Sequence, residues 1–194
     1  MKTIDADIFL GLLHYPIYNK LGDKITTTIT NYDLHDIARA ARTYDINKYY
    51  VINHLKSQQQ LVERMKGYWT SGRGADYCYN RHEAFSVLEI ASTLDEVKES
   101  IKNKTEKDAV LIATDAKKFE NSVSYSNMRE IFAEDDRPFL IIFGTGYGLT
   151  EETLEQCDYI LDPVIGRGDF NHLSVRSAVS IILDRLLASP WWTK

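Results

Sequence analysis

The stretch Phe139–Glu152, FLIIFGTGYGLTEE, decides the fold of this chain more than any other segment. Its first five residues are all apolar, which is typical of a strand that is covered on both faces of a sheet. A glycine turn follows, with Gly144, Gly146 and Gly148, and Thr150 is placed to cap a short helix. A buried strand, a glycine turn and a helix in this order indicate an α/β sheet, in which ligands bind at the carboxyl ends of the strands.

The rest of the chain alternates short apolar runs with helical periodicity. The pattern predicts strands at 8–13, 48–53, 86–91, 109–113, 139–143 and 159–161. It predicts helices at 33–44, 58–69, 94–103, 128–132, 150–156 and 173–187. Residues 16–32 are expected to form a loop with extended pieces and residues 71–75 a flexible turn, and Asn31 or Asp33 is expected to cap the first helix. We therefore expect one α/β domain over residues 1–194, with a mostly parallel sheet and helices on both faces.

Composition narrows the function classes. The chain has 194 residues, 44% of them hydrophobic, and a formal net charge of −5, which argues against a protein that coats nucleic acid non-specifically. An RNA enzyme with a local basic rim remains open. Cys78 and Cys157 show no metal-ligand spacing and indicate a reducing compartment. Residues 8–14 are interpreted as a strand rather than a signal peptide, and no apolar run is long enough to span a bilayer. We expect a cytoplasmic protein that binds neither a membrane nor a metal.

The glycine turn alone leaves the ligand open. GTGYG lacks the full G-x-G-x-x-G spacing of a dinucleotide fold, and it lacks the G-K-[ST] of a phosphate-binding loop. An oxidoreductase that binds a nucleotide such as NAD is one alternative on these residues.

The order of the later segments gives a second signal. Residues 143–163, the polar loop after them, and HLSVRSAVSIIL at 172–183 resemble the last two motifs of the SPOUT RNA methyltransferases. The helix DLHDIARAARTY at 33–44 resembles the upstream motif of the ribose-methylating branch, with Arg39 in the place of its arginine and Tyr44 in the place of its aromatic residue. Together with HYPIYNK at 14–20, it is similar to a small bacterial group of stand-alone SPOUT proteins.

The resemblance implies a deep trefoil knot at the C-terminal end and S-adenosylmethionine as cofactor. It also implies a homodimer whose active sites are completed across two subunits, and an RNA substrate, either tRNA or rRNA. The methyl group would pass to a ribose hydroxyl or a base nitrogen. A knotted module that binds S-adenosylmethionine without catalysis, and assists another RNA-modifying enzyme, is the alternative within this superfamily.

The resemblance also implies site residues. Arg39 and Asp169 are the expected catalytic residues, with Asp169 as general base. The expected cofactor-binding residues are Thr114, Phe143, Gly144, Thr145, Gly146, Gly148, Leu149, Ile160, Leu161, Pro163, Leu173, Ser174, Val175 and Ala178. The expected substrate-binding residues are His14, Asn19, Arg167, Asn171, His172 and Arg176.

The chain departs from the family pattern in its catalytic part. The glycine turn is one residue shorter and lacks the usual glutamate. Asp33 stands in the place of an asparagine, Ser174 in the place of another asparagine, and Arg176 in the place of a serine. At the C-terminus, Trp191 and Trp192 are expected to cover a subunit interface or the sheet edge.

Overall fold

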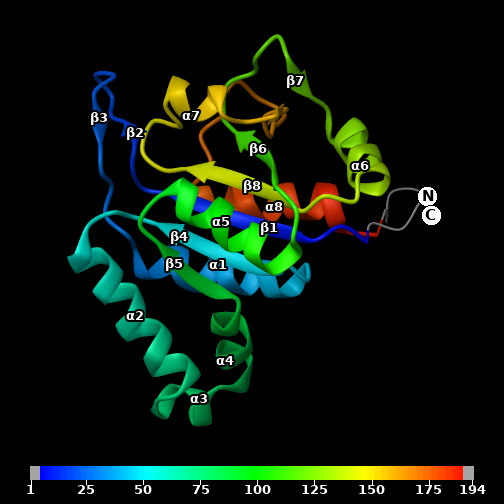
Figure 1. The fold of residues 1–194 in the computed structure, drawn as a ribbon. Coiled ribbons are helices and arrows are strands. Elements are labelled where there is room, and N and C mark those ends of the chain that lie inside the picture. Colours follow the sequence, from blue (N-terminus) through cyan, green and yellow to red (C-terminus); the bar gives the residue numbers. More distant parts are fainter. Residues whose placement is uncertain (1–4, 190–194) are drawn as a thin grey trace.

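The computed structural model describes residues 5–189, and its centre is a seven-stranded sheet with the strand order β5–β4–β1–β8–β6–β9–β7 (Figure 1). Every neighbouring pair of strands in this sheet is parallel, which confirms the predicted sheet class. The strands are β1 (Ile8–Leu13), β4 (Lys48–Ile52), β5 (Leu88–Ala91), β6 (Val110–Thr114), β7 (Ser122–Val123), β8 (Phe139–Gly144) and β9 (Tyr159–Leu161). Trp191 and Trp192, which are predicted to cover a subunit interface or the sheet edge, lie outside the described residues.

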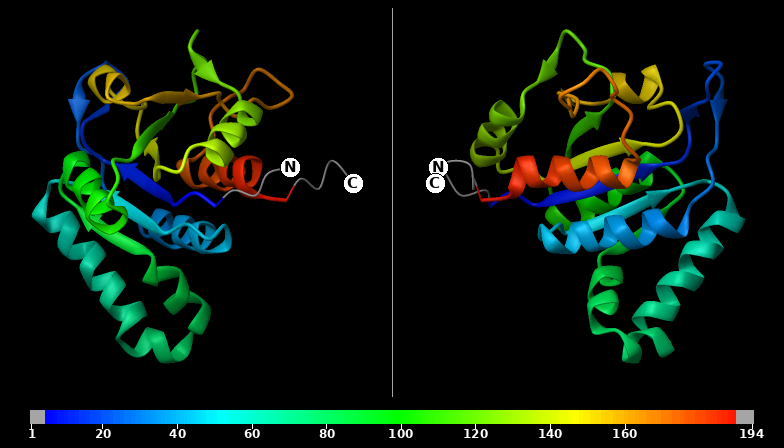
Figure 2. Two further views of the ribbon diagram at one scale, coloured as in Figure 1. Left: turned by 45° about the vertical axis from the view of Figure 1, so that its right-hand side comes forward. Right: turned by 180° about the vertical axis from the view of Figure 1, so that it is seen from behind.

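Eight helices connect or flank the strands within the described residues. They are α1 (Asn31–Thr43), α2 (Lys56–Thr70), α3 (Arg73–Tyr77), α4 (Tyr79–Ser86), α5 (Leu94–Thr105), α6 (Tyr125–Glu134), α7 (Glu151–Glu155) and α8 (Val175–Leu187). In the three views, α1 and α8 run side by side along the sheet, and α2, α3 and α4 extend away from it (Figures 1 and 2). No helix of this set has the length and apolar character needed to cross a membrane.

The central strands are apolar because both of their faces are covered. All six residues of β1 are buried, and their side chains alternate between two core clusters. Leu10 and Leu12 pack in the cluster that α1, α6 and α8 share, whereas Phe9 and Leu13 pack in the cluster that α5 joins. The prediction of helices on both faces is therefore confirmed.

The structure corrects three local predictions. The segment 71–75, expected as a flexible turn, contains the start of α3, and α4 follows where no helix was predicted. A Cβ on Gly74 would lie 2.6 Å from the Tyr68 ring and 2.7 Å from the Trp69 ring, so tertiary packing outweighs the local turn preference. The cap of α1 is Thr30, not Asn31 or Asp33, because the Thr30 hydroxyl accepts the hydrogen bond from the Asp33 amide.

A small antiparallel hairpin lies outside the main sheet. Its strands are β2 (Ile17–Tyr18) and β3 (Lys24–Ile25), within the segment that was expected to be a loop with extended pieces. It follows directly after the carboxyl end of β1 and precedes α1, so it lies at the ligand-binding end of the sheet.

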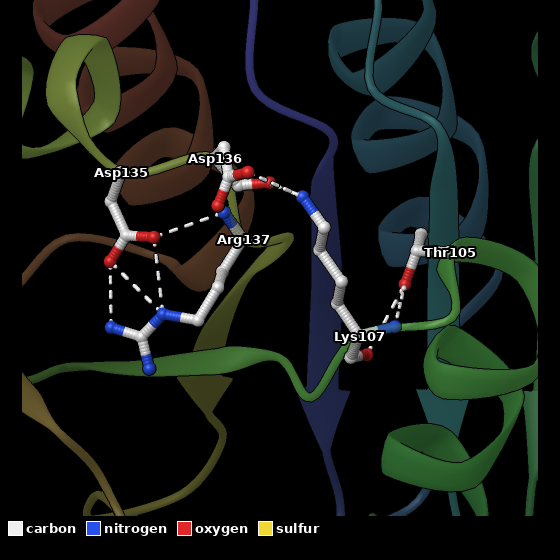
Figure 3. Close-up of polar contacts among 5 residues, drawn as sticks. All are labelled: Thr105, Lys107, Asp135, Asp136 and Arg137. Carbon is white, nitrogen blue, oxygen red and sulfur yellow. Dashed lines mark hydrogen bonds and ion pairs between the residues drawn. The ribbon is translucent and has the colours of Figure 1, made fainter.

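Charged contacts join the loops at the opposite end of the sheet (Figure 3). The Lys107 ammonium, before β6, donates to the Asp136 carboxylate at 2.7 Å and to the Asp136 carbonyl at 2.9 Å. Next to it, the Arg137 guanidinium donates to both oxygens of Asp135, at 2.6 and 3.1 Å, and holds the pKa of that carboxyl below its usual value. The Lys107–Asp136 contacts tie together the loops that precede β6 and β8.

Candidate functional site

A cavity of about 550 Å³ lies at the carboxyl ends of β6 and β8. Four segments that are far apart in the sequence supply most of its lining: 27–33 before α1, 114–117 after β6, 143–148 in the glycine turn, and 171–178 at the entrance to α8. Its volume is within the range that holds a small organic ligand or cofactor. The glycine turn and the entrance to the last helix therefore face one common space.

Many of the residues predicted from sequence to bind the cofactor line this cavity. They are Thr114, Phe143, Gly144, Thr145, Gly146, Gly148, Leu173, Ser174, Val175 and Ala178. Leu149, Ile160, Leu161 and Pro163 are buried but are not part of the lining. Of the predicted substrate-binding residues, Asn171, His172 and Arg176 line the cavity, whereas His14, Asn19 and Arg167 do not.

The glycines of the turn have a physical reason that the sequence did not reveal. Gly146 and Gly148 have φ values of +59° and +101°, in the left-handed region that favours glycine. A Cβ on Gly146 would lie 3.0 Å from both Ile17 Cγ2 and the Tyr18 carbonyl oxygen. A Cβ on Gly148 would lie 3.0 Å from the carboxylate of Asp115. Protein atoms, and not only the space for a ligand, therefore require glycine here.

The β2–β3 hairpin holds the glycine turn from outside the sheet. The Tyr18 amide donates to the Gly148 carbonyl at 3.2 Å, and the Tyr147 amide donates back to the Tyr18 carbonyl at 3.0 Å. Lys24 forms an ion pair with Glu152 at the start of α7. Asn19 shapes the tip of the hairpin, because its side-chain oxygen accepts from the Leu21 and Asp23 amides at 2.8 and 2.9 Å.

Threonines from the segment before α1 contribute cavity residues that sequence reasoning missed. Thr27, Thr28 and Thr30 all line the cavity. The hydroxyls of Thr27 and Thr145 lie 2.5 Å apart, and Thr145 also donates to the Leu13 carbonyl at 3.2 Å. The run TTTIT at 26–30 is the signal in the sequence, but it predicts extended structure and does not by itself indicate a ligand.

His14 lies behind these threonines rather than in the cavity. Its Nδ1 is 2.9 Å from the Thr27 hydroxyl, and its side chain is almost completely buried. Burial lowers the pKa of His14 to about 4, so the imidazole is neutral near pH 7. Its Nε2 has no hydrogen-bond partner in the part of the chain that the structure describes.

Asp33 brings a carboxylate to the cavity wall. Its Oδ2 accepts from the Thr30 hydroxyl at 2.5 Å, and its Oδ1 lies 3.2 Å from a guanidinium nitrogen of Arg176. Arg176 also lies 3.4 Å from the Asp36 carboxylate, and its guanidinium is 5.5 Å from the ring centre of Tyr32. Arg176, predicted to bind substrate, is therefore engaged by two carboxylates of α1.

The polar entrance to α8 has several structural partners. Ser174 caps the helix, because its hydroxyl accepts from the Ser177 amide at 3.4 Å. The Asn171 side-chain Nδ2 donates to the Ala116 carbonyl at 2.7 Å and ties the loop to the end of β6. Leu173 and His172 are exposed and line the cavity.

The two predicted catalytic residues lie outside the cavity. Arg39 is exposed in a groove of about 610 Å³ between α1 and α8, which Tyr44, Ser177 and Ser180 also line. Asp169 is exposed in the loop before α8. Their catalytic roles stay predictions. Among the residues that the structure describes, no group of three or more side chains has the composition of a metal site.

The lining fits S-adenosylmethionine in its chemistry. Apolar groups of Phe143, Val164 and Leu173 can cover an adenine ring, and the carboxylate of Asp115 suits a cationic ligand with ribose hydroxyls. The glycine turn from Phe143 to Gly148 lines the same cavity.

Comparison with known proteins assigns the chain to a family. A family model described as SAM-dependent RNA methyltransferase matches residues 7–188. A protein of Aquifex aeolicus (strain VF5), described as uncharacterized, is 45% identical over 185 residues, which cover 95% of this chain and 90% of that protein. A protein of Oleidesulfovibrio alaskensis named tRNA (guanine-N(1)-)-methyltransferase is 34% identical over 93% of this chain. The chain spans only 42% of the length of that relative.

Solved structures share the fold at low sequence identity. The TrmH/SpoU tRNA modifying enzyme of A. aeolicus has a TM-score of 0.55 and 15% identity, over 96% of this chain and 75% of that one. The SpoU methyltransferase AviRb of Streptomyces viridochromogenes, solved with AdoMet, has a TM-score of 0.53 and 16% identity, over 94% and 57%.

Proposed function

The chain belongs to the family of SAM-dependent RNA methyltransferases, and we propose that it transfers a methyl group from S-adenosylmethionine, bound in the cavity at the end of β8, to a nucleotide of tRNA or rRNA. The accepting atom is a ribose hydroxyl or a base nitrogen. The guanine-N1 activity in the name of the longer relatives belongs to proteins of which this chain spans 42%, so it does not select between these atoms.

One observation carries the proposal. The glycine turn and the entrance to α8 are the two segments that resemble the cofactor motifs, and both line the same cavity. The alternative of an NAD-type oxidoreductase does not fit a chain of this family.

In the proposed complex, the cofactor supplies an activated methyl group on a sulfonium centre. The glycine turn, from Phe143 to Gly148, and the stretch from Leu173 to Ala178 would hold the adenosyl part between them. The work of the protein is then to exclude water, to orient the RNA atom that attacks, and to accept its proton.

We also propose that residues 1–194 act as one domain and that α8 passes through the deep trefoil knot of the superfamily. The family match over residues 7–188 supports the first point, and the neighbours' SPOUT-type fold supports the second. A cytoplasmic location agrees with an RNA substrate of this kind.

We further propose a homodimer that uses the groove between α1 and α8. Arg39 supports it, because its guanidinium is exposed in that groove and makes no hydrogen bond or ion pair with the described residues. In a dimer formed there, Arg39 would approach the partner's cavity and steady the RNA phosphate or the activated hydroxyl.

The test is binding followed by transfer. Isothermal titration calorimetry with S-adenosylmethionine should show saturable binding, and NAD should not bind. Tritiated S-adenosylmethionine should then label total RNA from a strain that lacks this gene. Absence of cofactor binding would overturn the proposal as a whole, whereas binding without transfer to any RNA would favour the non-catalytic module. Mass spectrometry of the labelled nucleosides identifies the methylated atom.

A further inference from the structure

The acid–base groups at the cavity differ in their burial. Those that line it are Asp33, Asp115, Lys117, Tyr147, His172 and Arg176. Asp33 is 6% exposed and is the only buried carboxylate among the described residues, whereas the others are half-buried or exposed. Burying a carboxylate is costly unless it is compensated, so its position at a ligand cavity needs an explanation.

Both oxygens of Asp33 are held in place. Oδ2 accepts from the Thr30 hydroxyl at 2.5 Å, and Oδ1 lies 3.2 Å from Arg176. The amino terminus of α1 adds favourable positive charge, because Asp33 lies in its first turn. These groups hold the side chain in a single orientation at the cavity wall.

Helix capping alone does not account for this arrangement, as α5 shows. Glu96 occupies the same position after its own threonine cap, Thr93, and its carboxylate accepts from the Ser92 amide at 2.6 Å at the surface. The Asp33 carboxylate instead binds a hydroxyl and the guanidinium of the last helix, and it lines the cavity. Asp33 therefore has an orientation that a cap residue does not need.

The groups behind Asp33 are neutral. The negative charge of Asp33 acts on both His14 and Tyr49, which are almost fully buried. Burial lowers the pKa of His14 and raises that of Tyr49, so neither carries charge near pH 7. His14 Nε2 and the Tyr49 hydroxyl have no hydrogen-bond partner among the described residues. The cation that contacts Asp33 is Arg176, which also forms an ion pair with Asp36.

We propose that Asp33 is the catalytic proton acceptor of this enzyme, in place of the exposed Asp169. The inference rests on the proposed function, and it also gives a reason for the aspartate that stands where the family has asparagine. The attacking nitrogen or oxygen of the RNA forms a bond to the methyl carbon, and the carbon–sulfur bond breaks with its electron pair passing to sulfur. The proton of the attacking atom passes to the Asp33 carboxylate, which later releases it to solvent.

Asp33→Asn tests the proposal, because it keeps a side chain of the same shape but removes the basic oxygen. Single-turnover methyl transfer to the RNA substrate should fall about 100-fold or more, the usual contribution of general-base catalysis. Affinity for S-adenosylmethionine and for S-adenosylhomocysteine should stay unchanged by calorimetry. The variant's transfer rate should also rise about tenfold per pH unit above neutrality, because the RNA atom must then lose its proton to hydroxide. Glu96→Gln is the matched control and should match the wild type in each measurement.

The outcomes separate the two proposals. If the wild-type chain binds no cofactor or labels no RNA, the proposed function fails. If the wild type transfers and Asp33→Asn transfers equally fast, or loses rate without the new pH dependence, Asp33 is not the proton acceptor. If Asp33→Asn weakens binding of S-adenosylmethionine but not of S-adenosylhomocysteine, the carboxylate acts on the sulfonium charge and the inference is overturned.

Discussion

At the scale of single residues, the glycine turn is set by contacts that a sequence does not display. Gly146 faces Ile17 and Tyr18 of the hairpin with a positive φ, whereas Gly166 lies in the open loop before α8 and has no atom within 4 Å of a Cβ position. The same substitution at these two positions therefore separates the backbone requirement from a general effect of removing glycine.

We expect Gly146→Ala to lower the free energy of unfolding by about 1–2 kcal/mol, from left-handed strain and from the 3.0 Å contact with the Tyr18 carbonyl. Affinity for S-adenosylmethionine should fall with it, because the turn must move away from the hairpin. Urea denaturation and calorimetry measure the two effects, and Gly166→Ala should show neither. Equal behaviour of the two variants would contradict this account of the turn.

His14 gives a prediction on pH. Its pKa is lowered from 6.5 to about 4 in the folded chain, so between these values the unfolded chain binds a proton that the folded chain excludes. The contribution of the neutral His14 to the free energy of unfolding is fully present above pH 6.5. It is lost as the pH falls toward 4, by about 3 kcal/mol in total.

Urea denaturation of the wild type and of His14→Asn, at about pH 5 and about pH 7, measures this contribution. The variant should be less stable than the wild type at neutral pH, because it loses the packing of the imidazole, but its stability should depend less on pH. A variant with the same pH dependence as the wild type would show that His14 is not responsible.

At the scale of elements, α1 and α5 have the same kind of start but different surroundings. Thr30 and Thr93 each accept the hydrogen bond of the amide three residues on, at 3.2 Å in both helices. Only Thr30 also donates to a carboxylate that lines the cavity. The beginning of α1 thus combines a cap with a part of the site.

Thr30→Ala and Thr93→Ala should each lower the free energy of unfolding by about 1 kcal/mol, the usual loss for a threonine cap. Only Thr30→Ala should also slow methyl transfer, because Asp33 then loses the hydroxyl that orients it. Chemical denaturation and single-turnover transfer, measured on both variants, check this difference. Slowing by both variants would indicate a general effect of helix stability.

At the scale of the whole molecule, the positions of Arg39 and Asp33 suggest how two chains could share one reaction. Asp33 lines the cavity of its own chain, while Arg39 lies in the α1–α8 groove. In the proposed homodimer, a complete site takes Asp33 from one chain and Arg39 from its partner.

Mixed dimers test this arrangement. Arg39→Ala and Asp33→Asn homodimers should both bind S-adenosylmethionine and transfer poorly. A heterodimer of the two, purified with two different tags, should recover transfer, because one of its cavities has an intact Asp33 and faces an intact Arg39. A heterodimer as inactive as its parents would exclude the exchange of Arg39 between subunits, and ultracentrifugation of each variant controls for loss of the dimer.

The order of the elements and the class of the sheet could be predicted from the sequence. The apolar run 139–143 is typical of a strand that is buried on both faces. The periodicity of 173–187 is typical of a helix that is buried on one face, and both patterns are local properties of the sequence. The two segments that resemble cofactor-binding motifs could also be recognised from the sequence, since each is one continuous segment. The start of α3 was missed because it depends on the close packing of Gly74 against Tyr68 and Trp69, which local propensity does not contain.

The sequence by itself determined a parallel α/β chain with a glycine turn and a polar helix entrance, because those features depend on neighbours along the chain. The tertiary structure alone decided which side chains share the cavity. It brought Thr27, Thr30 and Asp33 to the same cavity as the glycine turn, and it left Arg39 and Asp169 outside. The physical reason is that burial and pairing of a charge, such as that of Asp33 with Arg176, depend on the position of segments 143 residues apart.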